Sequence, residues 1–260
     1  MKPKIIFFGN GPLADYSKPI LAANFDLLFH ARTKSDLETV KSLKREHPEA
    51  FGILASFGVI VKSDILELFE PTGILNLHPS LLPKYRGASP IESAILNGDE
   101  IFSISIMKLV LAMDAGPIYH QATFDFHGQT KTKDEIYQTL AEAGATWLTK
   151  HLENLPTPIP QDDKLATFTK KLDKSMSLLN PTEKTAAALL NEVRAFKNFP
   201  KSKYSFFGLD CIILSAHISN FAETPLSLEC SDHQFLIIDE IQPAGRKAMD
   251  AKSFLNGYAK

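Results

Sequence analysis

One motif-rich stretch stands in the first third of the chain: Gly73-Ile74-Leu75-Asn76-Leu77-His78-Pro79-Ser80-Leu81-Leu82-Pro83-Lys84-Tyr85-Arg86-Gly87. It begins as a short apolar strand on which Asn76 and His78 stand two residues apart, so both side chains point to the same face. Pro79 ends the strand, because its ring removes a backbone donor. An amide and an imidazole at the carboxyl end of a strand are a common start of an active site in an α/β sheet. The alternative is structural: Asn76 closes a turn and His78 is a buried histidine with satisfied partners.

Strand and helix patterns alternate before this stretch. Apolar strand patterns cover residues 4–8, 26–30 and 51–56, and helical patterns cover residues 13–22, 35–47 and 63–69. Ser35 with Glu38 predicts a capping box for the second helix, and Ser63 predicts a cap for the third. This alternation predicts an α/β domain with a doubly wound, mostly parallel, Rossmann-like sheet. The ligand site is then expected at the carboxyl ends of the strands.

The pattern continues after the stretch. Ser89 and Pro90 start a helix that Gly98 ends. Residues 101–109 alternate in polarity and predict a strand with one exposed face, and residues 117–126 predict another strand. A helix with an apolar stripe is expected over residues 132–152. Asp114 falls in the loop between the two strands.

The last third of the chain differs in composition. Prolines alternate through residues 155–160 and predict a stiff, extended connector, which a lysine-bearing stretch follows. A helix is expected from Thr182, and short strands over residues 204–207, 211–216, 226–230 and 235–238 predict a small barrel or sandwich, of which we choose an OB-like β-barrel. The expected organisation is a catalytic domain over residues 1–160, a linker over 161–180 and the barrel over 181–260.

Composition narrows the class of protein. The 260 residues carry a net charge of −2, so a nucleic-acid partner needs a local basic patch rather than a diffuse positive field. No apolar run reaches membrane-spanning length, and Ile5 to Phe8 is too short for a signal-peptide core, so we expect a cytoplasmic protein without membrane contact. Cys211 and Cys230 are expected to be buried thiols, and no residue spacing predicts a metal site.

The polar residues suggest one kind of chemistry. Asn76, His78 and Asp114 supply an amide donor, an imidazole and a carboxylate, and no motif positions a serine or cysteine nucleophile. This set suits attack by an external amine on a carbonyl group, because the amide can bind the developing oxyanion while a cationic imidazole assists. Spacing alone does not place Asp114 beside the strand, because Asp114 follows His78 by 36 positions in the sequence.

A wider set of motifs resembles the folate-dependent formyltransferases: residues 75–87, Pro90-Ile91, Asn97-Gly98-Asp99-Glu100, Ile106-Met107 and Met113-Asp114-Ala115-Gly116. The resemblance implies that 10-formyltetrahydrofolate is the formyl donor. It implies catalytic roles for Asn76, His78 and Asp114. It further implies a folate pocket built from Phe57, Gly58, Val59, Ile60, Ser80, Leu81, Leu82, Pro83, Met113 and Asp114.

The end of the chain bears on the acceptor. A second domain separates this chain from the glycinamide-ribonucleotide branch of the family. Residues 241–249 and 254–257 resemble the branch whose acceptor is methionyl initiator tRNA, whereas residues 193–200 are shared with the sugar-nucleotide branch. The resemblance therefore implies methionyl initiator tRNA as partner of a monomeric enzyme. An aminosugar nucleotide is the alternative acceptor, and a folate- or tRNA-binding module without chemistry is the alternative class.

Two departures from the family pattern stand out. His30-Ala31-Arg32-Thr33-Lys34 leads almost directly into a helix, so the basic insertion that many tRNA formyltransferases carry there is absent. Val110 and Ala112 replace the polar or glycine residues usual before Asp114. The tRNA contacts are therefore assigned to Arg86, Arg246 and Lys247. For Lys84 and the linker lysines (Lys164, Lys170, Lys171, Lys174), tRNA contact and plain solvation are equal alternatives.

Overall fold

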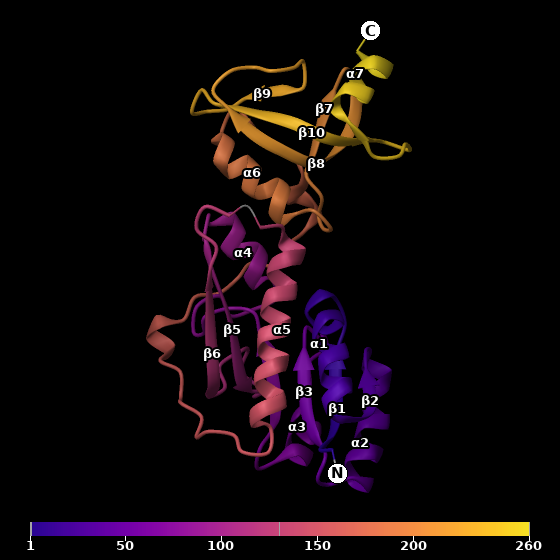
Figure 1. Cartoon of the computed structure of the whole chain (residues 1–260), viewed down its shortest axis with the longest axis vertical. Helices are drawn as coiled ribbons and strands as arrows, with labels where there is room; N and C mark the ends of the chain where they lie inside the picture. Colours follow the sequence, from indigo (N-terminus) through magenta and orange to yellow (C-terminus); the bar gives the residue numbers. More distant parts are fainter. Residues whose placement is uncertain (1, 130, 260) are drawn as a thin grey trace. The chain divides into compact units, whose positions relative to one another are not determined.

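The computed structural model describes residues 2–129 and 131–259. They form two compact units, coloured along the chain in Figure 1. The first unit is built from Met1–Ile91 and Glu100–Lys170, and the second from Glu92–Asp99 and Lys171–Lys260. The assignment of residues 1–160, 161–180 and 181–260 to a catalytic domain, a linker and a barrel remains our proposal.

The first unit is organised around a six-stranded sheet with the order β2-β1-β3-β4-β5-β6. Its strands are β1 (Lys4–Gly9), β2 (Asp26–Ala31), β3 (Phe51–Ala55), β4 (Ile74–His78), β5 (Ile101–Lys108) and β6 (Ile118–Asp125). Strands β2, β1, β3 and β4 are parallel, while β5 and β6 run antiparallel to their neighbours. This confirms the expected mostly parallel α/β sheet.

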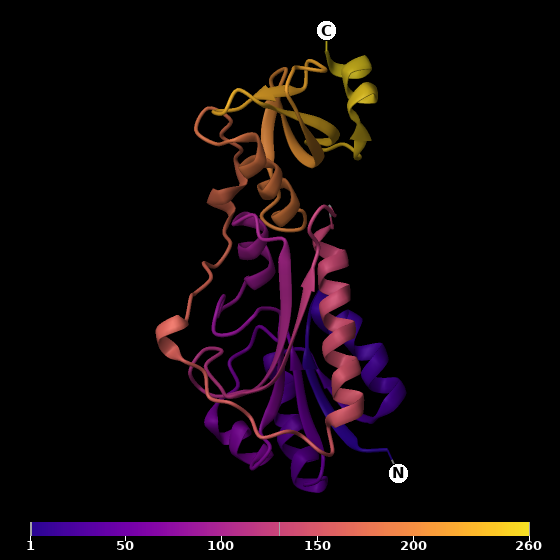
Figure 2. The ribbon, with the colours of Figure 1, turned by 60° about the vertical axis from the view of Figure 1, so that its left-hand side comes forward.

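Helices cover both faces of this sheet, as Figure 2 shows. On one face α1 (Pro12–Asn24) packs beside α5 (Lys133–His151), and Gly144 of α5 lies close to Leu77 and Ile104 of the sheet. On the other face α2 (Leu37–Glu46), α3 (Ser63–Leu66) and the 3-10 turn η2 (Glu67–Phe69) share a buried cluster with β1, β3 and β4. The central strands are therefore buried on both sides, which explains their uninterrupted apolar sequences.

Two helix starts differ from the sequence prediction. The capping box belongs to Thr33 and Asp36 rather than to Ser35 and Glu38, because a 3-10 turn η1 (Lys34–Asp36) precedes α2. The Asp36 carboxylate accepts from Arg32 N at 2.7 Å and Thr33 N at 2.8 Å. In α3 the N-cap position is Lys62, with no side-chain cap, so Ser63 is the first helical residue and not the cap.

The prediction that one face of β5 is exposed was wrong. Residues 102–107 are all buried, because β5 lies between β4 and β6 and α5 packs on it. Its serines satisfy their hydroxyl groups internally: Ser105 Oγ donates to Ser80 O at 2.6 Å, and Ser103 Oγ lies 3.1 Å from Thr123 Oγ1. Alternating polarity here reflects buried hydrogen bonding rather than exposure.

The second unit combines helices with an antiparallel sheet. The sheet has the order β11-β10-β8-β7, with β9 also on β10, and comprises β7 (Lys203–Phe206), β8 (Leu209–Ser219), β9 (Ser227–Glu229), β10 (Phe235–Pro243) and β11 (Met249–Asp250). It curls as a half-barrel over α6 (Ala186–Ala195) and α7 (Ala251–Tyr258) (Figure 1). Thr185 caps α6 by accepting from Ala188 N at 3.2 Å, so this helix starts later than the expected Thr182.

The remaining short helices are α4 (Pro90–Leu96), η3 (Asp163–Leu165) and η4 (Lys174–Ser177). Within residues 2–129 and 131–259, no helix combines the length and apolar character needed to cross a membrane.

Candidate active site

A cavity of about 420 Å³ opens at the carboxyl ends of β3 and β4 in the first unit. This is where a doubly wound sheet is expected to bind its ligand. Its lining comes from the segment after β3, the end of β4, the 87–90 turn, the segment before Asp114 and α5. The lining residues are Leu54, Ser56, Phe57, Gly58, Val59, Ile60, Val61, Asn76, Leu77, His78, Pro79, Gly87, Ala88, Pro90, Leu109, Val110, Leu111, Met113, Asp114 and Tyr137.

Asn76 offers a buried amide to this cavity. The residue is only 5% exposed. No other residue among 2–129 and 131–259 forms a hydrogen bond with its side chain, although buried carboxamides are normally satisfied. The amide is therefore available to a bound ligand, and the alternative that Asn76 closes a turn finds no bond to support it.

His78, on the same face of β4, is held between two oxygen acceptors. Its Nε2 lies 3.0 Å from Tyr85 O and donates to it, since a carbonyl oxygen can only accept. Its Nδ1 lies 3.6 Å from Asp114 Oδ1. Both ring nitrogens thus lie near oxygen atoms: Tyr85 O accepts a hydrogen bond, and Asp114 Oδ1 lies just beyond hydrogen-bond distance.

Asp114 completes the cluster from the β5–β6 connection. Its Oδ2 accepts from Gly87 N at 2.8 Å, while Oδ1 faces His78. Its backbone has φ of 49°, a left-handed conformation that non-glycine residues adopt rarely and that is often found at functional sites. The structure therefore brings together the three residues that the resemblance selected.

The predicted folate residues divide into two groups. Phe57, Gly58, Val59, Ile60 and Met113 line the cavity. Gly58 has φ of 68° and open space where a Cβ would stand, whereas Ile60 and Met113 leave 84% and 64% of their surface exposed at the rim. An exposed apolar rim of this kind is typical of a ligand site.

The second group, residues 80–83, does not line the cavity. These residues form a turn tied to the sheet: Ser80 Oγ donates to Lys84 O at 2.7 Å, and Gln121 Nε2 donates to Leu82 O at 2.9 Å. Leu82 N also donates to Ser105 Oγ at 3.2 Å. Their observed contacts hold the loop that carries Tyr85.

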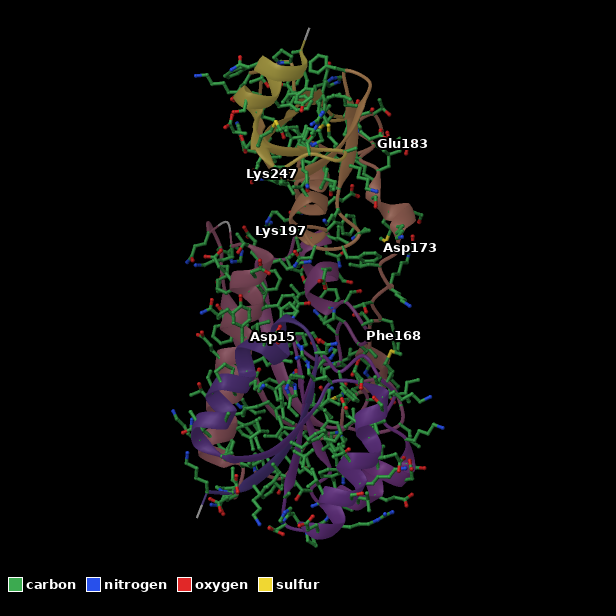
Figure 3. All side chains as sticks on the ribbon, turned by 90° about the vertical axis from the view of Figure 1, so that its right-hand side faces the viewer. Asp15, Phe168, Asp173, Glu183, Lys197 and Lys247 are labelled. Atoms are coloured by element: carbon green, nitrogen blue, oxygen red, sulfur yellow. The ribbon has the colours of Figure 1, made fainter. Side chains whose placement is uncertain are left out.

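The three residues expected to contact tRNA lie in different settings. The Arg86 side chain is 5% exposed and pairs with Asp163 at 2.7 Å, so its guanidinium is engaged inside the first unit. Arg246 and Lys247 are exposed at the turn between β10 and β11, and Figure 3 labels Lys247 there.

Three residues in or behind the site escaped the sequence analysis. Tyr137 reaches the cavity from α5, and Leu111 from the segment before Asp114. Gln161 lies behind Asp114 and bonds to the backbone of its turn. None carries a local pattern, because each is placed by packing between distant segments. Among residues 2–129 and 131–259, no cluster of three or more His, Cys, Asp or Glu side chains could hold a metal ion.

Family models cover most of the chain. The formyl transferase model matches residues 8–152, and the formyl transferase C-terminal domain model matches residues 171–259. A relative from Granulibacter bethesdensis, named methionyl-tRNA formyltransferase, is 34% identical over 237 residues, which are 84% of this chain and 74% of the relative.

Solved structures share the fold at lower identity. A methionyl-tRNA formyltransferase from Clostridium thermocellum has a TM-score of 0.70 and 19% identity, covering 94% of this chain and 99% of that one. HypX from Aquifex aeolicus has a TM-score of 0.74 and 14% identity. The match covers 99% of this chain but only 49% of HypX, so this chain spans about half the length of HypX. An N-formyltransferase from Helicobacter canadensis, in complex with folinic acid and dTDP-3-aminofucose, has a TM-score of 0.68 and 18% identity. The match covers 94% of this chain and 100% of that enzyme. The chain belongs to the formyl transferase family, with both its N-terminal and its C-terminal domain present.

Proposed function

We propose that the protein transfers the formyl group of 10-formyltetrahydrofolate to the α-amino group of methionyl initiator tRNA. The observation that carries this proposal is the Asn76–His78–Asp114 cluster on a cavity of about 420 Å³ in a formyl transferase fold. The relatives named methionyl-tRNA formyltransferase, at 31–34% identity, support the acceptor. A protein of the cytoplasm, where translation starts, is part of the same proposal.

The residues present fit a folate co-substrate. Pockets for small ligands usually measure about 300–1,000 Å³ and pair an apolar lining with a few polar groups that set the orientation. Here the lining is mostly aliphatic, and the nine-tenths buried Asn76 amide has no protein partner among the described residues. Residues 57–60 and Met113 would hold the ring system, and the co-substrate supplies the formyl group that is transferred.

Asn76 is the candidate donor for the reacting oxygen. When an amine attacks the formyl carbon, negative charge grows on the formyl oxygen. A preorganised amide within a buried cavity stabilises that charge without having to reorganise solvent. Its neighbour His78 strengthens the local positive field when it is protonated.

His78 and Asp114 form the candidate proton-handling pair. The attacking nitrogen must lose a proton and the departing nitrogen must gain one, so one group near the bond must carry a proton between them. Asp114 Oδ1 faces the imidazole at 3.6 Å, and its other oxygen is fixed by Gly87 N. Asp114 is therefore the candidate acceptor for the proton of the amine, with His78 beside it to orient the carboxylate.

An aminosugar nucleotide is the second candidate acceptor. It is favoured by the short connection between β2 and α2, which carries no basic insertion for an acceptor stem, and by the fold shared with the Helicobacter canadensis enzyme. We rank it second, because the curated relatives quoted above are tRNA enzymes.

The two acceptors can be separated directly. The purified protein is incubated with 10-formyltetrahydrofolate and either methionyl initiator tRNA or a dTDP-aminosugar, and formylated product is measured by mass. We expect formylmethionyl-tRNA and no formylated sugar. Formylation of the sugar alone would show that the aminosugar nucleotide is the acceptor. If neither acceptor is formylated, the remaining alternative is a folate- or tRNA-binding module without chemistry.

A further inference from the structure

Segment 161–170 lies along the loop that follows β4. Arg86 N donates to Thr167 O at 2.8 Å, and Thr169 N donates to Arg86 O at 2.8 Å, as in a short parallel bridge. Thr167 N adds a bond to Pro83 O at 3.2 Å. Figure 3 marks this segment by Phe168. All these residues belong to the first unit, and their backbone bonds fix the segment beside the loop that leads into the cavity.

Gln161, at the start of this segment, bridges two loops of the site. Its Nε2 donates to Asp114 O at 2.8 Å and to Gly116 O at 2.7 Å. Its Oε1 accepts from Arg86 Nη2 at 2.8 Å and from Arg86 Nε at 3.2 Å. The carboxamide orientation is unambiguous, since a guanidinium only donates and backbone carbonyls only accept.

Arg86 anchors this bridge. Its side chain is 5% exposed, and Nη2 also donates to Asp163 Oδ1 at 2.7 Å. A buried guanidinium must satisfy its donors, so it holds the Gln161 oxygen firmly in place. The residue expected to contact tRNA is thus already committed to the fold beside the cavity.

The anchored amide grips the turn that carries Asp114. Asp114 lies inside the turn that Ala115 N closes on Ala112 O, and Gly116 follows it. One NH₂ group binds the carbonyls of both Asp114 and Gly116. Asp114 sits there with φ of 49°, a conformation that its surroundings must enforce. The carboxylate position relative to His78 and Gly87 therefore depends on where the turn is held.

We infer that Gln161, fixed by Arg86, is a positioning residue that sets the Asp114 carboxylate against His78. This inference rests on the proposed function, in which Asp114 handles the proton. Gln161 is not among the lining residues of the cavity, and it reaches the site through the backbone of Asp114 and Gly116.

The test replaces Gln161 by Glu, which keeps an acceptor for Arg86 but loses both donors to the turn. We expect kcat for formyl transfer to fall at least tenfold, with KM for the folate within threefold of wild type. Gln129→Glu is the matched control: it makes the same change on an exposed side chain and should leave kcat within twofold. If Gln161→Glu does not fold, Gln161→Met removes both donors to the turn without adding charge, together with the acceptor for Arg86, and should also lower kcat at least tenfold.

A double-mutant cycle distinguishes positioning from general support of the structure. In an Asp114→Asn background, Gln161→Glu should lower the single-turnover rate less than twofold, because the carboxylate that Gln161 positions is already absent. Full multiplication of the two losses, or a folded Gln161 variant with wild-type kcat, would overturn the inference. An inactive wild-type protein would instead refute the proposed function, so the two failures are distinguishable.

Discussion

Asn76 and His78 owe their common direction to the two-residue period of a strand, and β4 delivers both to the cavity. Their roles differ because their surroundings differ. The histidine is engaged by Tyr85 O and Asp114, while the asparagine amide has no partner among the described residues. At this scale, the polar group that the fold leaves unsatisfied is the one we assign to the developing oxyanion.

His30 provides a pH prediction at the same scale. Burial lowers the pKa of its imidazole below the ordinary 6.5, despite the bond from Nε2 to Gly9 O. The unfolded chain therefore binds this proton at a higher pH than the folded protein does. As pH falls through 6.5 toward the folded pKa, His30 should lower the free energy of unfolding.

Urea unfolding at pH 7.0 and 5.5 measures this effect. His30→Gln, whose amide can still donate to Gly9 O, should lose less stability on acidification than wild type. His127→Gln is a control of opposite sign, because the hydrogen bond that His127 donates to Asp125 raises the pKa of His127 and stabilises the fold at low pH. An identical acid sensitivity of His30→Gln and wild type would refute the assignment.

The β5–β6 connection is the element that carries Asp114, and its geometry depends on a close approach at Gly116. A Cβ built there would stand 1.8 Å from Lys108 O, which no small adjustment relieves. Gly116→Ala should therefore force the backbone apart and lower the free energy of unfolding by about 1–3 kcal/mol. Thermal unfolding of the purified variant measures this loss.

Gly257 in α7 is the matched control for this substitution. Its added Cβ meets nothing within 4 Å, so Gly257→Ala should retain or raise the melting temperature. Equal melting temperatures for Gly116→Ala and wild type would show that the connection adapts to a larger residue. The positioning of Asp114 by this turn would then lose its structural basis.

Sequence periodicity predicted the elements whose pattern is local. Strands β1 to β4 and helix α5 follow from apolar runs and from a 3.6-residue stripe. It predicted β5 as a strand but not its burial, because the serines of β5 bond across the sheet. It also missed the helix starts at Thr33 and Thr185, which depend on single turns. The last helix, α7, was not foreseen from its eight residues.

The same contrast holds for the site. Asn76 and His78 could be read from one strand, whereas Asp114 needed the family resemblance, because spacing does not fix a residue 36 positions away. Gln161 gave no signal, since its role arises where three distant segments meet. Contacts between distant segments therefore mark the limit of what this sequence predicts.

The molecule as a whole carries a net charge of −2, so tRNA binding must come from local cations. Arg246 and Lys247 stand exposed at the β10–β11 turn and remain our candidates. Each phosphate contact releases counterions, so the double variant Arg246→Gln/Lys247→Gln should reduce the log–log salt slope of tRNA binding by roughly one to two units. Filter binding over a range of salt concentrations measures that slope.

Arg45→Gln/Lys150→Gln is the matched control, because it removes the same charge from exposed positions in α2 and α5. It should leave the slope close to that of wild type. If both double variants lower the slope equally, Arg246 and Lys247 make no specific contact with tRNA. The acceptor would then have to be held elsewhere on the chain.

The most direct test of the account is the single-turnover rate of formyl transfer from 10-formyltetrahydrofolate to methionyl initiator tRNA in wild type, Asn76→Ala and the control Asn24→Ala. We expect formylmethionyl-tRNA from the wild type, the same rate for the exposed Asn24 variant, and a loss of ~10²–10³ for Asn76→Ala with folate affinity largely retained. A wild-type rate in Asn76→Ala would contradict the assignment of the oxyanion donor. A wild-type protein that forms no formylmethionyl-tRNA would contradict the proposed function itself.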